Sequence, residues 1–75
     1  MNVNLEDFKT GWYGVTIGLN TQEIDRLIDA LTAIKKDKSH FHLRSEFDGD
    51  GGVGDIEIYW EENDISSNMT LESLV

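Results

Sequence analysis

Apolar and polar residues alternate in two neighbouring stretches of the chain, and this period of two is typical of half-buried β-strands. The first stretch runs from His40 to Phe47 and the second is centred on Ile58, with a turn rich in Gly and Asp between them. The pattern predicts a β-hairpin. Its core-facing side chains are expected to be Phe41, Leu43, Ile56, Ile58 and Trp60.

The first part of the chain predicts another pair of strands. Alternation favours a short strand at residues 2–8 and a second one at residues 12–19, with a turn at Thr10 and Gly11. Gly14 and Gly18 leave one face of the second strand thin, so another backbone can approach closely there, or the glycines mark a bulge or an exposed, weakly packed surface.

An amphipathic helix is expected from Asn20 or Thr21 to about Lys36. Asn20 and Glu23 have the spacing of a capping box, and the lysines near the end complement the helix dipole. The apolar residues recur at helical spacing and must be buried against the strands. They are Ile24, Leu27, Ile28, Leu31 and Ile34.

These elements add up to β-β-α-β-β, which predicts an α+β fold: a largely antiparallel sheet with one amphipathic helix packed on one face. Residues 1–62 are expected to form a single domain. Residues 63–75 are expected to be a short docking element or a flexible tail.

Length and composition exclude several classes of function. A chain of 75 residues can bury only a small core, which leaves little room for an enclosed active site. Cys is absent, which excludes disulfides and thiolate metal sites, and no nucleophile motif is present, so we expect no enzyme activity. The first residues lack the features of a signal peptide and no apolar run is long enough to cross a membrane. We therefore expect a cytoplasmic protein whose mature form is the whole chain, with no membrane partner and no cofactor.

The net charge of −9 belongs entirely to the second half of the chain. Residues 1–45 contain as many bases as acids, whereas residues 46–75 contain acids and no Lys or Arg. An acidic surface of this kind favours a basic protein partner. Direct binding of nucleic acid is not expected, because no basic stripe is present to neutralise phosphates.

Aromatic residues bordered by acids are suited to anchoring a basic partner, because Trp and Tyr provide contact area and carboxylates accept Arg. The exposed strand face, the turn and the acidic run after the hairpin are the predicted contact region. The predicted partner-binding residues are Trp12, His40, His42, Glu46, Asp48, Asp50, Asp55, Glu57, Tyr59, Glu61 and Glu62.

Two motifs in this region invite an ion-binding interpretation. His40 and His42 emerge on the same face of a strand, but a metal would need a third ligand such as Glu46 or Glu57 from a neighbouring strand, and the sequence does not set that register. We therefore predict no metal site and interpret the pair as exposed or partner-contacting histidines. The Asp and Gly residues at 48–55 fail the spacing of a calcium-binding EF-hand loop and are expected to form a turn with positive φ angles.

The segment Ser39-His40-Phe41-His42-Leu43 after the helix, followed by a Gly-containing connection and the closing strand Asp55-Ile56-Glu57-Ile58-Tyr59-Trp60, resembles the immunity protein 32 family of bacterial polymorphic-toxin systems. The resemblance covers about residues 11–62. It implies a small cytoplasmic protein that neutralises a toxin, commonly an enzyme, by tight binding.

The sequence thus favours a non-enzymatic inhibitor that covers the basic surface or active site of a partner such as a toxin enzyme. One alternative is a DNA-mimicking or phage-type acidic regulator of a nucleic-acid-binding protein. A second is a small metal-dependent protein that uses His40 and His42. A third is a homo-oligomeric structural module, such as a homodimer formed through an exposed sheet edge or face.

Overall fold

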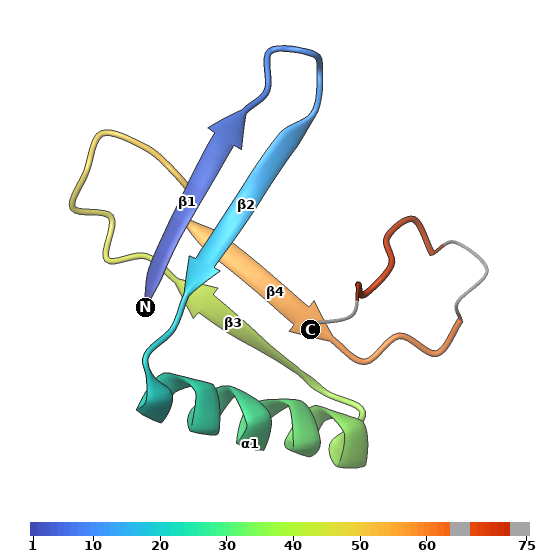
Figure 1. Cartoon of the computed structure of the whole chain (residues 1–75). Coiled ribbons are helices and arrows are strands. Elements are labelled where there is room, and N and C mark those ends of the chain that lie inside the picture. Colours follow the sequence, from blue (N-terminus) through green and yellow to red (C-terminus); the bar gives the residue numbers. More distant parts are fainter. Residues whose placement is uncertain (64–66, 73–75) are drawn as a thin grey trace.

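The computed structural model describes residues 1–63 and 67–72, and it confirms the α+β fold class and the predicted order of elements (Figure 1). Four strands and one helix follow one another as β-β-α-β-β. The elements are β1 (Asn2–Asp7), β2 (Tyr13–Gly18), α1 (Thr21–Asp37), β3 (His40–Arg44) and β4 (Asp55–Tyr59). Within the described residues, no helix is long and apolar enough to cross a membrane.

Strands β1 and β2 form an antiparallel hairpin whose two faces differ in character. Val3 pairs with Ile17 and Leu5 pairs with Val15, so the apolar side chains of both strands share one face. The turn uses positive φ angles at Lys9 (58°) and Gly11 (94°), and the Phe8 N–H donates to the Trp12 carbonyl at 3.1 Å. The expected turn at Thr10 and Gly11 is therefore confirmed.

Gly14 has a packing role that the sequence left open. The ring of Phe8 lies against its backbone, and a Cβ atom built on Gly14 would sit 2.7 Å from Phe8 Cζ. Phe8 follows the last residue of β1 and falls outside the strand's alternation. The group that approaches the thin face of β2 is thus an aromatic ring of the same hairpin.

Helix α1 begins with the predicted capping box. The Asn20 side chain accepts from the Glu23 N–H at 2.9 Å, and the Glu23 side chain accepts from the Asn20 N–H at 3.0 Å. The helix ends at Lys38, which adopts a left-handed conformation (φ 53°) and donates its backbone N–H to the Ile34 carbonyl. Lys38 Nζ then lies 5.0 Å from the centroid of the Trp60 ring, at a distance suited to a cation–π contact.

Strands β3 and β4 form the second antiparallel hairpin, in which Phe41 pairs with Ile58 and Leu43 with Ile56. These four residues and Trp60 are half-buried, in agreement with their predicted core-facing role. The first strand is shorter than expected, since it ends at Arg44. Phe47 has a positive φ angle of 60° and is 73% exposed, so the alternation did not continue to Phe47 as predicted.

The two hairpins form two separate two-stranded sheets, although a single sheet was expected. Helix α1 packs against β3, and the β1–β2 hairpin projects away from the helix with its turn at the far end (Figure 1). Ile34 is the buried hydrophobic residue of the described part of the chain, at 8% exposure. The predicted burial is wrong for Ile24, Ile28 and Leu31, which are exposed because β3 covers only one side of the helix. The core therefore lies between the helix and the apolar face of the β3–β4 hairpin.

The segment that follows β4 was predicted to be a docking element or a tail. Residues 67–72 form neither helix nor strand, and Met69 and Leu71 are strongly exposed, the latter at 95%. This part of the segment is not docked through its apolar side chains. The rest of that prediction falls on residues 64–66 and 73–75, which lie outside the described residues.

Candidate functional site

The polar face of the β3–β4 hairpin collects most of the residues predicted to contact a partner. The register places His40 opposite Tyr59, His42 opposite Glu57 and Arg44 opposite Asp55. Because paired residues in an antiparallel sheet project to the same side, these six side chains form one surface. We call it the His/acid face, and it comprises His40, His42, Arg44, Asp55, Glu57 and Tyr59.

Asp55 holds two side chains of β3 in place. His42 Nδ1 lies 3.0 Å from Asp55 Oδ1 and 3.1 Å from Asp55 Oδ2. Arg44 Nε lies 3.3 Å from Asp55 Oδ1. The carboxylate therefore fixes the orientation of the His42 ring while its charge is shared with a guanidinium.

The two histidines and Glu57 lie close enough to act together. The rings of His40 and His42 meet edge to face with centroids 5.2 Å apart. His42 Nε2 lies 4.0 Å from Glu57 Oε1, and one ligand atom of each of the three residues falls within 4.8 Å of the others. The sequence predicted that the histidines share a face and left Glu46 and Glu57 open as their neighbour, and the register places Glu57 opposite His42.

Tyr59 and Glu61 form a coupled pair at the end of the His/acid face. The Tyr59 hydroxyl donates to Glu61 Oε2 at 2.9 Å, and the Asn63 N–H donates to Glu61 Oε1 at 3.1 Å. The hydrogen bond to the carboxylate and its negative charge raise the pKa of Tyr59 above its ordinary value. The Asn63 N–H, followed by the Tyr59 hydroxyl, lowers the pKa of Glu61. Glu61 is thus held as a carboxylate.

An open groove runs beside β4 and ends at the chain segment 67–69. It has a volume of about 680 Å³, and its lining combines carboxylates with apolar groups. Glu57 and Glu61 contribute the charge, while Ile58, Tyr59 and Met69 contribute apolar surface. Such a groove can accept a basic side chain with an aliphatic stem. Sequence reasoning missed Met69, because its pattern matched neither strand nor helix.

The acids of the β3–β4 turn form a separate group. Glu46, Asp48 and Asp50 are exposed on the connection between the strands, and Gly52 there has a φ angle of 122°. Glu46 and Asp48 line a second cavity, of about 540 Å³, together with the first residues of β1. The predicted positive-φ turn is confirmed, and it places these acids at the opposite end of the hairpin from Glu61 and Glu62.

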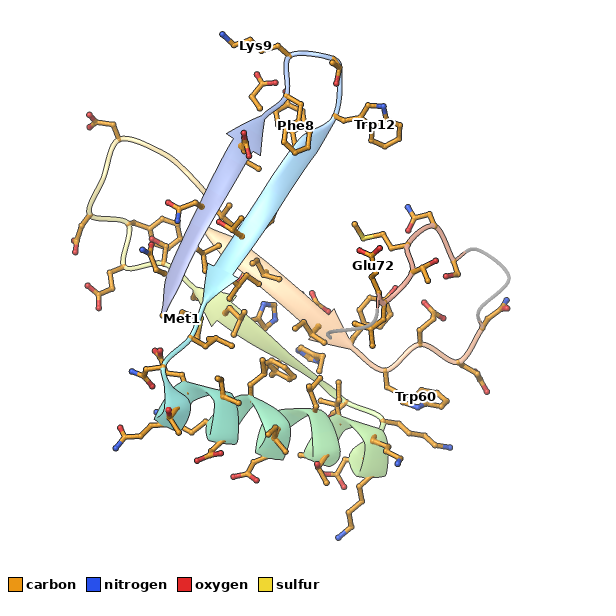
Figure 2. All side chains as sticks on the ribbon, viewed as in Figure 1. Met1, Phe8, Lys9, Trp12, Trp60 and Glu72 are labelled. Atoms are coloured by element: carbon orange, nitrogen blue, oxygen red, sulfur yellow. The ribbon has the colours of Figure 1, made fainter. Side chains whose placement is uncertain are left out.

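Trp12 does not join the His/acid face. It lies at the turn of the β1–β2 hairpin and is 76% exposed, whereas Trp60 lies beside the end of α1 (Figure 2). The predicted contact residues therefore occupy at least two separate surfaces.

The side chains of the His/acid face can bind basic groups and metal ions. Its carboxylates can accept hydrogen bonds from Arg or Lys, and its imidazoles can act as metal ligands. Among the described residues, the face contains no Ser or Thr hydroxyl in contact with a histidine, so the arrangement of an activated nucleophile is not formed there.

Comparison with known proteins identified no relative. No family model matches the chain, and no curated protein or solved structure matches it.

Proposed function

We propose that this chain is a non-enzymatic inhibitor that binds a basic surface of a protein partner. The acids of the β3–β4 hairpin and of the residues that follow it make the contact. The observation that carries this proposal is the separation of charge along the chain: all of the −9 net charge belongs to residues 46–75. Asp55, Glu57 and Glu61 place part of that charge on one continuous strand and its end.

The structure of the acidic surface supports binding to Arg or Lys side chains. Glu61 is held as a carboxylate by the Tyr59 hydroxyl and the Asn63 N–H, and it lines the groove beside β4. A fixed carboxylate next to an aromatic ring offers both charge and contact area to a guanidinium. The surrounding exposed acids would steer the encounter and raise the association rate.

A toxin enzyme with a basic active site is the partner class that we propose. The resemblance of residues 39–43 and 55–60 to the immunity protein 32 family adds to the electrostatic argument. In such a complex, the inhibitor's carboxylates would occupy the positions that an anionic substrate requires.

Co-expression with the product of the adjacent gene tests this proposal. We expect a stable complex and rescue of growth from the toxicity of that product. No complex and no rescue would contradict the proposed function.

Charge reversal tests which surface is responsible. Glu57→Lys combined with Glu61→Lys should slow association, and the loss should shrink as salt rises, because screening weakens long-range steering. The matched control is Glu6→Lys combined with Asp29→Lys, which makes the same change in charge in the neutral half. An equal loss in both variants would show that net charge alone, and not the acidic surface, governs binding.

A further inference from the structure

The His/acid face contains a ligand set that the strand register completes. His40 and His42 are two residues apart on β3, and Glu57 lies directly opposite His42 on β4. Their ligand atoms lie within 4.8 Å of one another. Two imidazole nitrogens and one carboxylate oxygen are a donor set found in zinc sites.

Asp55 prepares His42 for this role. A neutral imidazole that donates its Nδ1–H to Asp55 carries its lone pair on Nε2, and Nε2 lies 4.0 Å from Glu57 Oε1. The Nε2 lone pair and the Glu57 carboxylate oxygen then face each other. A cation between them would satisfy both, and the hydrogen bond from a ligating histidine to a carboxylate is the usual outer contact of a zinc site.

The spacing requires only a small adjustment. Tetrahedral zinc with bonds of about 2.0–2.1 Å needs ligand atoms about 3.3 Å apart. The present atoms are wider apart than this by roughly 1 Å. His40 and Glu57 have exposed side chains, so rotation of these groups can close the site without moving the strands.

We propose that His40, His42 and Glu57 bind one Zn²⁺ ion, with Asp55 as a positioning residue and the fourth coordination position open to water or to a group from a partner. This site does not depend on the proposed inhibitor function, since it needs only the hairpin.

Zinc titration of the full chain, with a competing chromophoric chelator, tests the site. We expect one equivalent of zinc for the wild type and at least tenfold weaker binding for His40→Ala, His42→Ala and Glu57→Gln. Asp55→Asn should weaken binding by about 10–100-fold, because it removes the contact that orients His42. Glu6→Gln is the matched control, since it removes the same charge from an exposed acid on the other hairpin and should bind zinc as the wild type does.

Cobalt substitution provides a second measurement, which reports the coordination geometry of the bound metal rather than its affinity. Co²⁺ should give visible absorption of tetrahedral character in the wild type, and the His40→Ala and His42→Ala double variant should lose it. Circular dichroism would verify that each variant keeps its fold. Equal zinc binding by the wild type and the double variant, or by Glu57→Gln, would overturn the proposal.

A different observation, the amount of exposed surface, points to self-association. A compact monomer of 8.5 kDa is expected to expose about 4,700 Å². The chain exposes 7114 Å², an excess of about 2,400 Å² over that expectation. The β3–β4 turn and residues 67–72 account for part of this excess, and the rest includes apolar surface on β1, β2 and α1.

The apolar face of the β1–β2 hairpin is the centre of this surface. Leu5 and Val15 pair across the strands, each about half exposed, and Ile17 lies two residues further along the same face. No third strand pairs with β1 or β2 in the part of the chain that the structure describes. A lone two-stranded hairpin is only marginally stable in water, so this one gains most from a partner surface.

Charge and area both favour a second copy of the chain as the occupant. Residues 1–45 carry balanced charge, so two copies can meet there without repulsion, whereas their acidic halves would repel each other. A standard interface buries about 800 Å² on each partner, and the excess of about 2,400 Å² is large enough to supply that area. We propose that the apolar β1–β2 face joins two copies in a symmetric dimer.

Sedimentation of the full chain over a range of concentrations tests the dimer. We expect the wild type to sediment at twice 8.5 kDa and Val15→Asp to dissociate at least tenfold more readily. Thr16→Asp is the matched control, because it adds the same charge to the opposite face of the same strand and should leave the dimer intact. A wild type that stays monomeric would overturn the proposal, and in that case loss of binding of the neighbouring gene product to Val15→Asp would assign the face to that protein instead.

Discussion

At the scale of single residues, several side chains have roles that follow from one specific contact. Phe8 covers Gly14, Asp55 orients His42, and Glu61 accepts the Tyr59 hydroxyl. One of these pairs joins two neighbouring strands, and each of the other two joins a strand to a residue just outside a strand end. Each can be tested by changing one partner and comparing it with a similar residue that lacks the contact.

The Phe8 contact makes Gly14 sensitive to substitution. Gly14→Ala places a methyl group 2.7 Å from Phe8 Cζ, so the half-exposed ring must move, and we expect the free energy of unfolding to fall by up to about 1 kcal/mol. Chemical denaturation would measure this loss. Gly18→Ala is the control, because its nearest contact is an ordinary 3.8 Å to the Asn2 carbonyl.

A double-mutant cycle separates the ring contact from the effect of losing Gly alone. In a Phe8→Ala background, Gly14→Ala should cost much less than it does in the wild type. If the cost is the same in both backgrounds, the ring is not its cause.

The Tyr59–Glu61 pair predicts that Tyr59 loses its proton at a higher pH than an ordinary tyrosine does. The raised pKa of Tyr59 means that its hydrogen bond stabilises the fold below the ordinary tyrosine pKa of about 10, and that this contribution is lost as pH rises through the raised value. Tyrosinate absorbance should show the late step, and Tyr59→Phe should remove it.

Changing the acceptor tests the cause of that shift. Glu61→Gln removes the negative charge and should lower the pKa of Tyr59 toward the ordinary tyrosine value. Glu62→Gln should leave the step nearly where it is, and an equal change in both variants would contradict a specific hydrogen bond.

At the scale of elements, helix α1 and the β3–β4 hairpin form the packed part of the molecule. The capping box and the left-handed cap at Lys38 define the two ends of the helix. Packing against β3 then decides which part of the apolar stripe is covered: Leu27 and Ala30 are half-buried and Ile34 is buried, while Ile28 is exposed. The stability of this unit should therefore depend on the covered side of the helix.

Ile34→Ala tests that dependence. Removing buried methyl groups leaves a cavity between the helix and β3, and we expect a loss of about 2–4 kcal/mol in the free energy of unfolding. Lys35→Ala, one residue further along on the exposed side, should change it by less than about 0.5 kcal/mol. Thermal or chemical denaturation of both variants would check the comparison, and equal small losses would show that Ile34 is not central to the core.

At the scale of the whole molecule, the chain combines a neutral half with exposed apolar surface and an acidic half with a polar face. Among the ion pairs of the described residues, Arg44 is the Lys or Arg residue that contacts the acidic strand β4, where it pairs with Asp55. Residues 46–62 contain no Lys or Arg that could pair with the remaining acids of this segment. Repulsion among them should destabilise the fold at low salt.

Added salt should therefore stabilise the protein. Screening weakens repulsion between exposed carboxylates, so the midpoint of thermal unfolding is expected to rise with ionic strength. Asp48→Asn combined with Asp50→Asn should raise the midpoint at low salt and reduce its salt dependence. A midpoint that falls with salt would show that attractive ion pairs outweigh the repulsion.

The sequence by itself determined the elements, the capping of the helix, the faces of the strands and the division of charge. These depend on local period and composition: Asn20 and Glu23 lie one turn apart, and His40 and His42 share a face because strands alternate. Phe47 shows where such local reasoning ends, because its positive φ angle belongs to a turn that alternation does not register.

Only the tertiary structure decided how those faces meet. The register brings Glu57 to His42, and the ring of Phe8 lies on Gly14. The strands separate into two sheets. No local pattern fixes which residues or strands pair in this way. The physical reason is that a period of two specifies which side of a strand faces inward, but leaves open which residue of another strand lies opposite.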